Sequence, residues 1–326
     1  MAIPKKIHYC WLSGEPFPSQ IRECIDSWHE FMPDYEYKLW DANSFDVDSV
    51  PYVRQAVDKR KWAFASDYIR LWALYTEGGI YLDSDIMVNK PFDDLLCERA
   101  FTAFESGGRV AAWIFASEAE NLVFKELLKY YEGRNFLNGE GIPELIPNTI
   151  PTTNILVKHG LMAKNETQRL DGITVFSEDY FCPMNPWTRR LNQTENTHAR
   201  HLFLGGWMDN KDDEAFMKEA EERTRTVAEK IISKSEYNKA YIFGAGIVGH
   251  IVLEYLKREY NAISVEGFIV SANEYGWDTV EDVPLYVVSD DNIDKNVPVI
   301  IATIPKLKSD IIKTLDERKF SEVLEL

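Results

Sequence analysis

Two aspartates one residue apart, Asp83 and Asp85, interrupt an apolar stretch that begins at Gly78-Gly79 and ends at Val88. An ionised carboxylate in an apolar interior costs several kcal/mol unless a cation or water compensates it. Successive strand side chains point to opposite faces, so a strand here would place both aspartates on one side and turn Ser84 away. Two such oxygen ligands suit Mn²⁺ or Mg²⁺, which complete their shells with water and substrate phosphates. The alternative is a turn whose aspartates cap the next element.

A second charged pair lies just before this stretch. Residues Trp62 to Tyr75 are apolar nearly all round, which predicts a buried helix, and Gly78 is placed to end it. Asp67 and Arg70 share a face of that helix, and an ion pair between them would stabilise it by only a few tenths of a kcal/mol. Such a weak pair does not account for two charges on so apolar a helix. We therefore prefer a polar site at the helix edge that uses both side chains.

These residues belong to a longer pattern that resembles glycosyltransferase family 32, the DXD-containing sugar transferases, and more distantly the clostridial glucosylating toxins. The matching segments follow the same order along roughly the first two thirds of the chain. They are Ile3 to Trp11, Cys24 to Trp28, Tyr35 to Asp41, Trp62 to Val88, and Thr197 to His201 with Trp207.

The resemblance implies a fold and a set of residue roles. It implies a GT-A type fold, with catalytic roles for Asp83, Asp85, Asp67 and Arg70 and a divalent metal, Mn²⁺ or Mg²⁺, held by Asp83, Asp85 and His201. The donor would be bound by Tyr9, Trp11, Asp67, Arg70, Tyr81, Ser84 and Trp207, with Trp207 closing a lid. Trp11 could instead be a core tryptophan, and His201 an ordinary core or surface histidine.

The composition is that of an acidic globular protein. Of the 326 residues, 45% are hydrophobic and 13% aromatic, enough for one large or two medium domains. The formal net charge of -17 argues against nucleic acid as a partner, because phosphate backbones select basic surfaces. No run reaches the length of a transmembrane helix, and no signal-peptide core precedes the first predicted strand. We expect a cytoplasmic protein with at most transient contact with the inner membrane face.

The order of predicted elements indicates an α/β protein with two domains. Residues 1 to 45 alternate strand, helix and strand, which predicts a sheet flanked by helices with ligands at the carboxyl ends of its strands. The charged residues 212 to 234 have helical spacing and predict a solvated helix that connects two units. We place the domains at 1–235 and 236–326.

The second domain is predicted to be a smaller Rossmann-like α/β unit. A strand runs into Gly244, Gly246 and Gly249, spaced as Gly-x-Gly-x-x-Gly, and a helix follows. The glycines could bind NAD, or they could serve only a tight turn and close helix packing. A dinucleotide site needs an acidic residue at the end of the second strand, where Ser271-Ala272-Asn273 stands, so NAD is not the expected ligand.

The combined prediction is a metal-dependent, retaining glycosyltransferase. It would move a hexose from a nucleotide-diphosphate sugar to a saccharide or glycolipid acceptor in bacterial surface (capsular) polysaccharide biosynthesis. Two alternatives stay open: an NAD-dependent enzyme that modifies sugar nucleotides, and a catalytically silent nucleotide-sugar-binding protein. A catalytically silent protein is disfavoured because the charged residues of the pattern are present: Asp83, Asp85, Asp67 and Arg70. Dehydrogenase chemistry is disfavoured because no acidic residue follows the second strand of the second domain.

Overall fold

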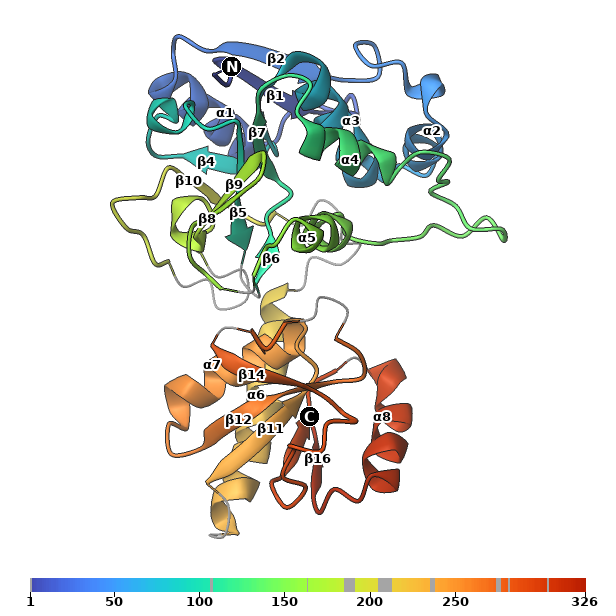
Figure 1. The fold of residues 1–326 in the computed structure, drawn as a ribbon, viewed down its shortest axis with the longest axis vertical. Coiled ribbons are helices and arrows are strands. Elements are labelled where there is room, and N and C mark those ends of the chain that lie inside the picture. The colour runs from blue at the N-terminus through green and yellow to red at the C-terminus, as the bar shows by residue number, and fades with distance from the viewer. Residues whose placement is uncertain are drawn as a thin grey trace. The chain divides into compact units, whose positions relative to one another are not determined.

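The computed structural model describes residues 2–105, 108–162, 164–184, 191–204, 213–234, 238–273, 277–280, 282–303 and 305–326. The chain divides into two compact units, each with its own sheet and its own helices (Figure 1). The first unit comprises residues 1–161, 165–185 and 191–209. The second comprises 210–326 with the short segments 162–164 and 186–190.

The first unit is built on a mixed sheet with the strand order β2-β1-β3-β7-β5-β9-β8, and β6 pairs with β5. β1 is parallel to β2 and β3, whereas β7 runs antiparallel to β3 and β5. Its strands are β1 (Lys6–Cys10), β2 (Glu36–Trp40), β3 (Gly79–Leu82), β5 (Ala100–Glu105), β6 (Arg109–Val110), β7 (Ile114–Ser117), β8 (Gln168–Leu170) and β9 (Ile173–Phe176). A separate antiparallel pair joins β4 (Ile86–Val88) to β10 (Ala199–His201).

Two apolar clusters cover the two faces of this sheet. The helices are α1 (Ser19–Phe31), α2 (Pro51–Asp58), α3 (Trp62–Glu77), α4 (Leu122–Lys129) and α5 (Thr149–Lys158). Side chains of β3 alternate between the clusters: Tyr81 packs with α3, whereas Ile80 and Leu82 pack with Trp28 of α1. The expected α/β class is therefore confirmed, as is the order of strand, helix and strand at the N-terminus.

The second unit has the strand order β13-β14-β12-β11-β15-β16, in which all neighbours except β13 and β14 are parallel. Its elements are α6 (Asp213–Ser233), β11 (Lys239–Phe243), α7 (Ile247–Glu259), β12 (Ser264–Val270), β13 (Thr279–Val280), β14 (Val283–Val287), β15 (Val299–Ile301), α8 (Pro305–Glu317) and β16 (Val323–Glu325). This order, with the first strand in the middle and helices between parallel strands, has the Rossmann-like form expected from the sequence.

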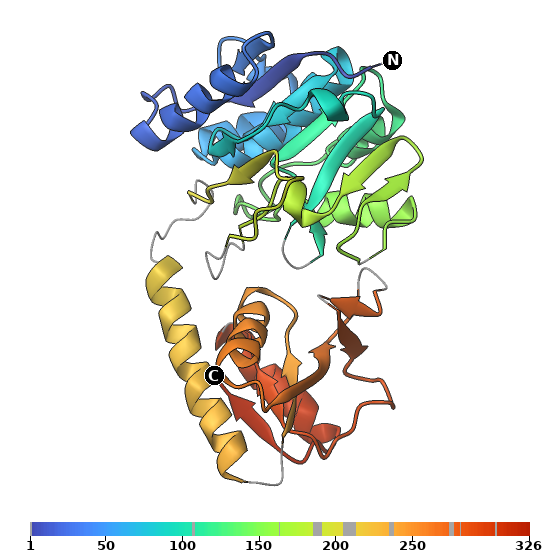
Figure 2. The same cartoon turned by 90° about the vertical axis from the view of Figure 1, so that its left-hand side faces the viewer.

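Helix α6 packs differently from the solvated connecting helix that its charges predict. It lies along α7 and buries Val227, Ala228 and Ile231 (Figure 2, yellow). Glu221 of α6 also pairs with Arg258 of α7 at 2.9 Å. The structure therefore groups α6 with the second unit, which starts near residue 210, whereas the sequence placed the boundary at 235. The apolar stripe of α6 is narrow and lies among many charged residues, so the sequence pattern did not predict this contact.

Within the described residues, no helix combines the length and the apolar character needed to cross a bilayer.

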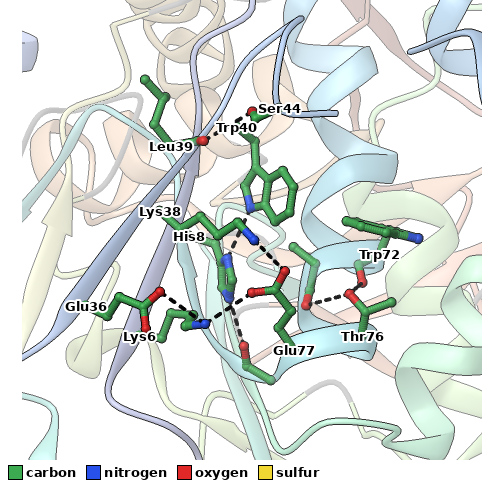
Figure 3. A network of polar contacts seen from close by, with 12 residues as sticks. Lys6, His8, Glu36, Lys38, Leu39, Trp40, Ser44, Trp72, Thr76 and Glu77 are labelled. Carbon is green, nitrogen blue, oxygen red and sulfur yellow. Dashed lines mark hydrogen bonds and ion pairs between the residues drawn. The ribbon is translucent and has the colours of Figure 1, made fainter. Parts of the chain in front are cut away.

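A buried histidine fixes the junction between α3 and β3 (Figure 3). Trp40 Nε1 donates to His8 Nδ1 at 3.1 Å, and His8 Nε2 lies 2.8 Å from the carbonyl oxygen of Gly78. An indole N–H can only donate, so Nδ1 accepts and the imidazole proton is on Nε2, which donates to Gly78. Gly78 and Gly79 have φ of 66° and 106°, and a Cβ on Gly79 would lie 2.6 Å from the Lys6 carbonyl oxygen. β3 therefore enters the sheet in one fixed register beside β1.

Charged side chains surround the same junction. Glu77, the last residue of α3, forms ion pairs with Lys38 at 2.6 Å and with Lys6 at 3.2 Å (Figure 3). The Lys38 ammonium also lies 4.2 Å from the ring centroid of Trp40. These contacts join β1, β2 and α3 at the end of the sheet opposite the two aspartates.

Titration of His8 should make the stability of the first unit depend on pH. Burial lowers the pKa of His8 from 6.5 to about 4, and the indole N–H that points at Nδ1 opposes a second proton. Because the folded state favours the neutral imidazole of His8, its contribution to stability is fully present above pH 6.5. This contribution is lost as the pH falls from 6.5 through 4. A shift of this size corresponds to roughly 3 kcal/mol.

We expect the free energy of unfolding of the wild type to fall between pH 7 and pH 4 by roughly 3 kcal/mol more than that of His8→Gln, which lacks the titrating group. Urea unfolding followed by tryptophan fluorescence measures both proteins. The pKa values of Asp67 and Glu105 are raised to about 7, so protonation of these two carboxylates at low pH favours the folded state. Both proteins contain these groups, and their contribution cancels in the comparison. Parallel pH profiles of the two proteins would contradict the proposed role of His8.

Candidate functional site

Asp83 and Asp85 lie in a turn between β3 and β4, which corrects the expectation of one continuous strand. β3 ends at Leu82 and β4 begins at Ile86. The Asp83 amide donates at 2.9 Å to the carbonyl oxygen of Trp113, the residue just before β7, and the Ile86 amide donates to the Asp83 carbonyl oxygen at 3.2 Å. The two side chains come together because of this turn, and strand alternation plays no part.

His201 completes a group of three potential metal ligands. β10 pairs with β4 so that His201 lies opposite Ile86, next to the turn. One ligand atom each from Asp83, Asp85 and His201 lies within 4.8 Å of the others. His201 Nε2 is 3.1 Å from Asp85 Oδ1, and the Leu204 amide donates to Asp85 Oδ2 at 3.0 Å. Two carboxylates and an imidazole form a donor set that fits Mn²⁺ or Mg²⁺.

The electrostatics of the group favour a charged Asp85. Burial acts to raise the pKa of Asp85, but His201 and the Leu204 amide outweigh it and hold that pKa below its ordinary value. Burial likewise acts to lower the pKa of His201, and Asp85 outweighs it, so the pKa of His201 is raised. The buried Nδ1 of His201 has no hydrogen-bond partner among the described residues. A divalent ion would take the place of the imidazolium proton opposite Asp85.

Arg70 links the turn to helix α3. Its Nη2 atom lies 3.1 Å from Asp67 Oδ1 and 3.2 Å from Asp83 Oδ1, and both Arg70 and Asp67 are buried. Its Nη1 atom donates to the Ala112 carbonyl oxygen, and its Nε to the Ser66 carbonyl oxygen. The intrahelical ion pair therefore exists, and the same guanidinium also neutralises Asp83.

Tyr81 supports the same two charges from the sheet. The Arg70 guanidinium lies 4.7 Å from the centroid of the Tyr81 ring, and the Tyr81 hydroxyl donates to Asp83 Oδ1 at 2.8 Å. Burial raises the pKa of Asp83, with Arg70 opposing the shift. The structure thus brings together Asp67, Arg70, Tyr81, Asp83, Asp85 and His201, six of the residues that sequence reasoning selected.

Other selected residues lie outside this cluster. Tyr9 packs edge-on against Trp28, with ring centroids 5.3 Å apart. Trp11 follows β1, packs against Phe17 at 4.9 Å and donates from Nε1 to the Glu15 carbonyl oxygen. Ser84 lies in the turn between the two aspartates. Trp207 lies outside the described residues, so its predicted lid role has no structural counterpart here.

The three glycines of the second unit have different surroundings. A Cβ on Gly244 would lie 2.7 Å from the Ala302 carbonyl oxygen, and one on Gly249 would lie 1.9 Å from the Gly244 carbonyl oxygen. Both glycines are required by the tight turn and by close packing. A Cβ on Gly246 would meet nothing within 4 Å. After β12, Asn273 Nδ2 donates to the Trp277 carbonyl oxygen at 2.6 Å.

Sequence reasoning missed Asn148 and Glu105. Asn148 Nδ2 donates to Asp67 Oδ1 at 2.6 Å from a position 81 residues further along the chain. It lies in the glycine- and proline-rich segment that joins α4 to α5, where no local pattern marks it. Glu105 ends β5, and burial raises its pKa to about 7, with Arg109 and His201 opposing.

Comparison with known proteins finds matches to part of the first unit. Residues 18–102 match the family model described as a glycosyltransferase sugar-binding region containing a DXD motif. Inositol phosphoceramide mannosyltransferase 3 of Schizosaccharomyces pombe is 36% identical over 102 residues, which cover 29% of this chain and 28% of that protein. Subversion of eukaryotic traffic protein A of Legionella pneumophila is 31% identical over 119 residues, covering 28% and 18%.

The matches are confined to part of each relative, since the chain spans less than a third of either protein.

Among solved structures, a PaToxG glycosyltransferase is 19% identical to this chain, with a TM-score of 0.37. The aligned residues make up 48% of this chain and 71% of that structure's chain. The matched segment contains Asp67, Arg70, Asp83 and Asp85, so the acidic turn and the buried ion pair both lie within the region that matches the DXD-containing sugar-binding family model.

Proposed function

We propose that the protein is a metal-dependent, retaining glycosyltransferase that moves a hexose from a nucleotide-diphosphate sugar to a saccharide or lipid-linked saccharide. The observation that carries the proposal is the grouping of Asp83, Asp85 and His201 within 4.8 Å, directly against the buried Arg70–Asp67 pair. The family match over residues 18–102 supports it. The proposal includes a cytoplasmic location and a role in bacterial surface-polysaccharide synthesis.

The chemical problem is the departure of a nucleoside diphosphate from the anomeric carbon of the sugar, because negative charge grows on the leaving oxygen. Asp83, Asp85 and His201 would hold the divalent ion, which acts as a Lewis acid toward the diphosphate. Asp85 is suited to this role because His201 and the Leu204 amide keep it ionised at neutral pH. The His201 ring packs against the rings of Trp113 and Phe203, at 4.8 and 4.1 Å between centroids.

Arg70 acts mainly on the protein's own carboxylates. Its donors are engaged by Asp67, Asp83, Ser66 and Ala112, so it holds Asp83 in the orientation that faces Asp85. Asn148 and Arg70 both contact Oδ1 of Asp67, which leaves Oδ2 for a donor hydroxyl. In a retaining reaction the leaving phosphate oxygen takes the proton of the acceptor, and no separate general base is required.

Asp85→Asn should abolish metal-dependent donor binding and leave the fold intact. The amide lacks the charge that the ion needs, and a loss of several kcal/mol of charge stabilisation corresponds to about a hundredfold to thousandfold lower turnover. Thermal-shift titration with a panel of nucleotide sugars, with and without Mn²⁺, measures binding, and release of nucleoside diphosphate measures turnover. Asp48→Asn makes the same chemical change at an exposed position and should behave as wild type. Wild-type donor stabilisation by Mn²⁺ in Asp85→Asn would contradict the metal-site assignment.

Arg70→Lys should lower kcat/KM by about tenfold to a hundredfold, because lysine keeps the charge but cannot contact Asp67, Asp83 and the Ala112 carbonyl at once. The matched control is Arg54→Lys on α2, where an exposed arginine pairs with Asp58. Circular dichroism and thermal unfolding distinguish loss of activity from loss of fold. If kcat/KM is unchanged in Arg70→Lys, Arg70 has no role in activity beyond its intrahelical ion pair with Asp67.

A further inference from the structure

His198 joins several segments of the first unit just before the short strand that carries His201. Its carbonyl oxygen accepts from the amides of Asn89 and Lys90, at 2.7 and 3.1 Å, where the chain leaves β4. Its own amide donates to the carbonyl oxygen of Tyr180 at 2.8 Å. β10 begins at the next residue and pairs with β4 in antiparallel register. The backbone contacts of His198 therefore set where β10 starts beside β4.

The imidazole of His198 is buried among aromatic rings. The residue is 1% exposed, and its ring is stacked on that of Tyr180, with 5.8 Å between centroids and 9° between planes. The ring centroids of Phe92 and Phe181 lie 5.9 and 5.7 Å from that of His198. Water does not reach a ring in such surroundings, so each of its nitrogens needs a partner from the protein.

Both ring nitrogens of His198 face groups that accept hydrogen bonds and do not donate them. Nδ1 lies 2.6 Å from the carbonyl oxygen of Asn196, and Nε2 lies 2.9 Å from Oδ1 of Asp94. Asp94 is half-exposed and also pairs with Lys90 at 3.4 Å, so it is a carboxylate at neutral pH. A neutral imidazole donates from one nitrogen only, whereas an imidazolium donates from both. Satisfying both contacts therefore requires the charged form of His198.

The charges around the ring suit an imidazolium. Burial acts to raise the pKa of Asp94, but the hydrogen bond with His198 and the charges of His198 and Lys90 outweigh it, so that pKa is lowered. The face of the Tyr180 ring, stacked on the imidazole, attracts a cation at this distance.

The titratable side chains of the segments around His198 come from η2 (Asp93–Leu95), η3 (Glu178–Tyr180) and the residues after β4. They are Lys90, Asp93, Asp94, Glu178, Asp179 and Tyr180. Asp93 pairs with Lys5. Asp179 accepts from Ser177, Thr194 and Asn196. Asp94 is thus the carboxylate that contacts the His198 ring.

β10 connects His198 to the candidate metal ligands. The strand has three residues, and His201 is its last. Beyond the strand, the amides of Leu202 and Leu204 donate to the carbonyl oxygen and to Oδ2 of Asp85, both at 3.0 Å. Before the strand, the corresponding contacts are those of His198. The position of the His201 imidazole therefore depends on both ends of β10, and metal sites lose affinity when the contacts that orient a ligand are removed.

We propose that His198 is an imidazolium held by Asp94 and the Asn196 carbonyl oxygen, and that it positions the metal site by fixing β10 so that His201 faces Asp85. The inference rests on the proposed function, because the metal site is proposed there. His198 acts through His201 and is a positioning residue. Loss of either ring proton would set a nitrogen lone pair against an acceptor oxygen, so β10 is held less firmly when His198 is neutral.

The protonation state of His198 is tested by ¹⁵N NMR of the metal-free, full-length protein at pH 7. The chain has six histidines, so few imidazole signals have to be distinguished. The signals of His198 are those that Asp94→Asn shifts and His198→Phe removes. Both of its ring nitrogens should show the chemical shift of a protonated imidazolium nitrogen. One unprotonated ring nitrogen in His198 would overturn the inference.

The positioning role is tested by the Kd for Mn²⁺, measured from the electron paramagnetic resonance signal of the free ion, alone and with a panel of nucleoside diphosphates. His198→Phe keeps an aromatic ring against Tyr180 but lacks the charge and both hydrogen bonds. Asp94→Asn keeps an acceptor oxygen and removes the charge at a half-exposed position. Each variant should raise the Kd at pH 7 about tenfold, the lower end of the loss that follows removal of a contact orienting a metal ligand. Circular dichroism and thermal unfolding establish that each variant is folded.

The matched control is His159→Phe, because His159 forms a second histidine–carboxylate pair, with Glu126 at 2.8 Å, outside the group of metal ligands. Its Kd for Mn²⁺ should be that of the wild type. The ratio of the Kd of His198→Phe to that of the wild type should fall toward one as the pH rises and the NMR signals show that His198 becomes neutral. His201 titrates in both proteins, so its own effect on Mn²⁺ binding cancels in the ratio. A ratio that does not change with pH would indicate a packing role alone and would overturn the inference.

Failure of this inference and failure of the proposed function give different results. If the wild type binds Mn²⁺ neither alone nor with any nucleoside diphosphate, the metal-site assignment fails and the positioning role of His198 fails with it. If the wild type binds Mn²⁺ and both His198→Phe and Asp94→Asn bind it equally well, only the inference about His198 fails.

Discussion

The first unit depends on the mutual neutralisation of Arg70, Asp67 and Asp83 in an apolar interior. A buried ion pair broken by removal of one partner costs about 3–5 kcal/mol, because the remaining charge is left without water. Here one guanidinium serves a carboxylate on α3 and another at the end of β3, so the helix and the strand cannot shift relative to each other without leaving a charge uncompensated. The same constraint holds Asp83 beside Asp85.

The opposite end of β3 is fixed by contacts of a different kind. Gly78 and Gly79 adopt backbone conformations that other residues rarely adopt, and the neutral imidazole of His8 donates to the Gly78 carbonyl oxygen. Beyond the turn, Trp28 Nε1 donates to the Ile86 carbonyl oxygen and Ser27 Oγ accepts from the Val88 amide. The two aspartates therefore lie on a short turn whose flanking strands are both anchored, the rigidity that a metal or donor site requires.

The Rossmann-like fold of the second unit does not by itself assign it a function. Its strand order and its Gly-x-Gly-x-x-Gly turn are those of a dinucleotide-binding fold, yet Gly244 and Gly249 are accounted for by packing, and Asn273 is engaged with Trp277. A Rossmann-like order supports many functions, so it does not by itself assign one. The charged face of α6 is solvent-facing, while its apolar stripe belongs to this unit's core.

Local sequence pattern determined the elements and the type of chemistry: the buried helix with Asp67 and Arg70, the glycine pair, the acidic pair, and the strand–turn–helix of the second unit. These features are encoded by period, burial and backbone preference over a few residues. Tertiary structure decided the partners. His201 meets Asp85 across 116 residues, and Asn148 meets Asp67 across 81, because strand pairing and the segment between α4 and α5 bring them there. It also put the aspartates in a turn and α6 on α7, since long-range packing selects among local conformations that the sequence pattern leaves equally open.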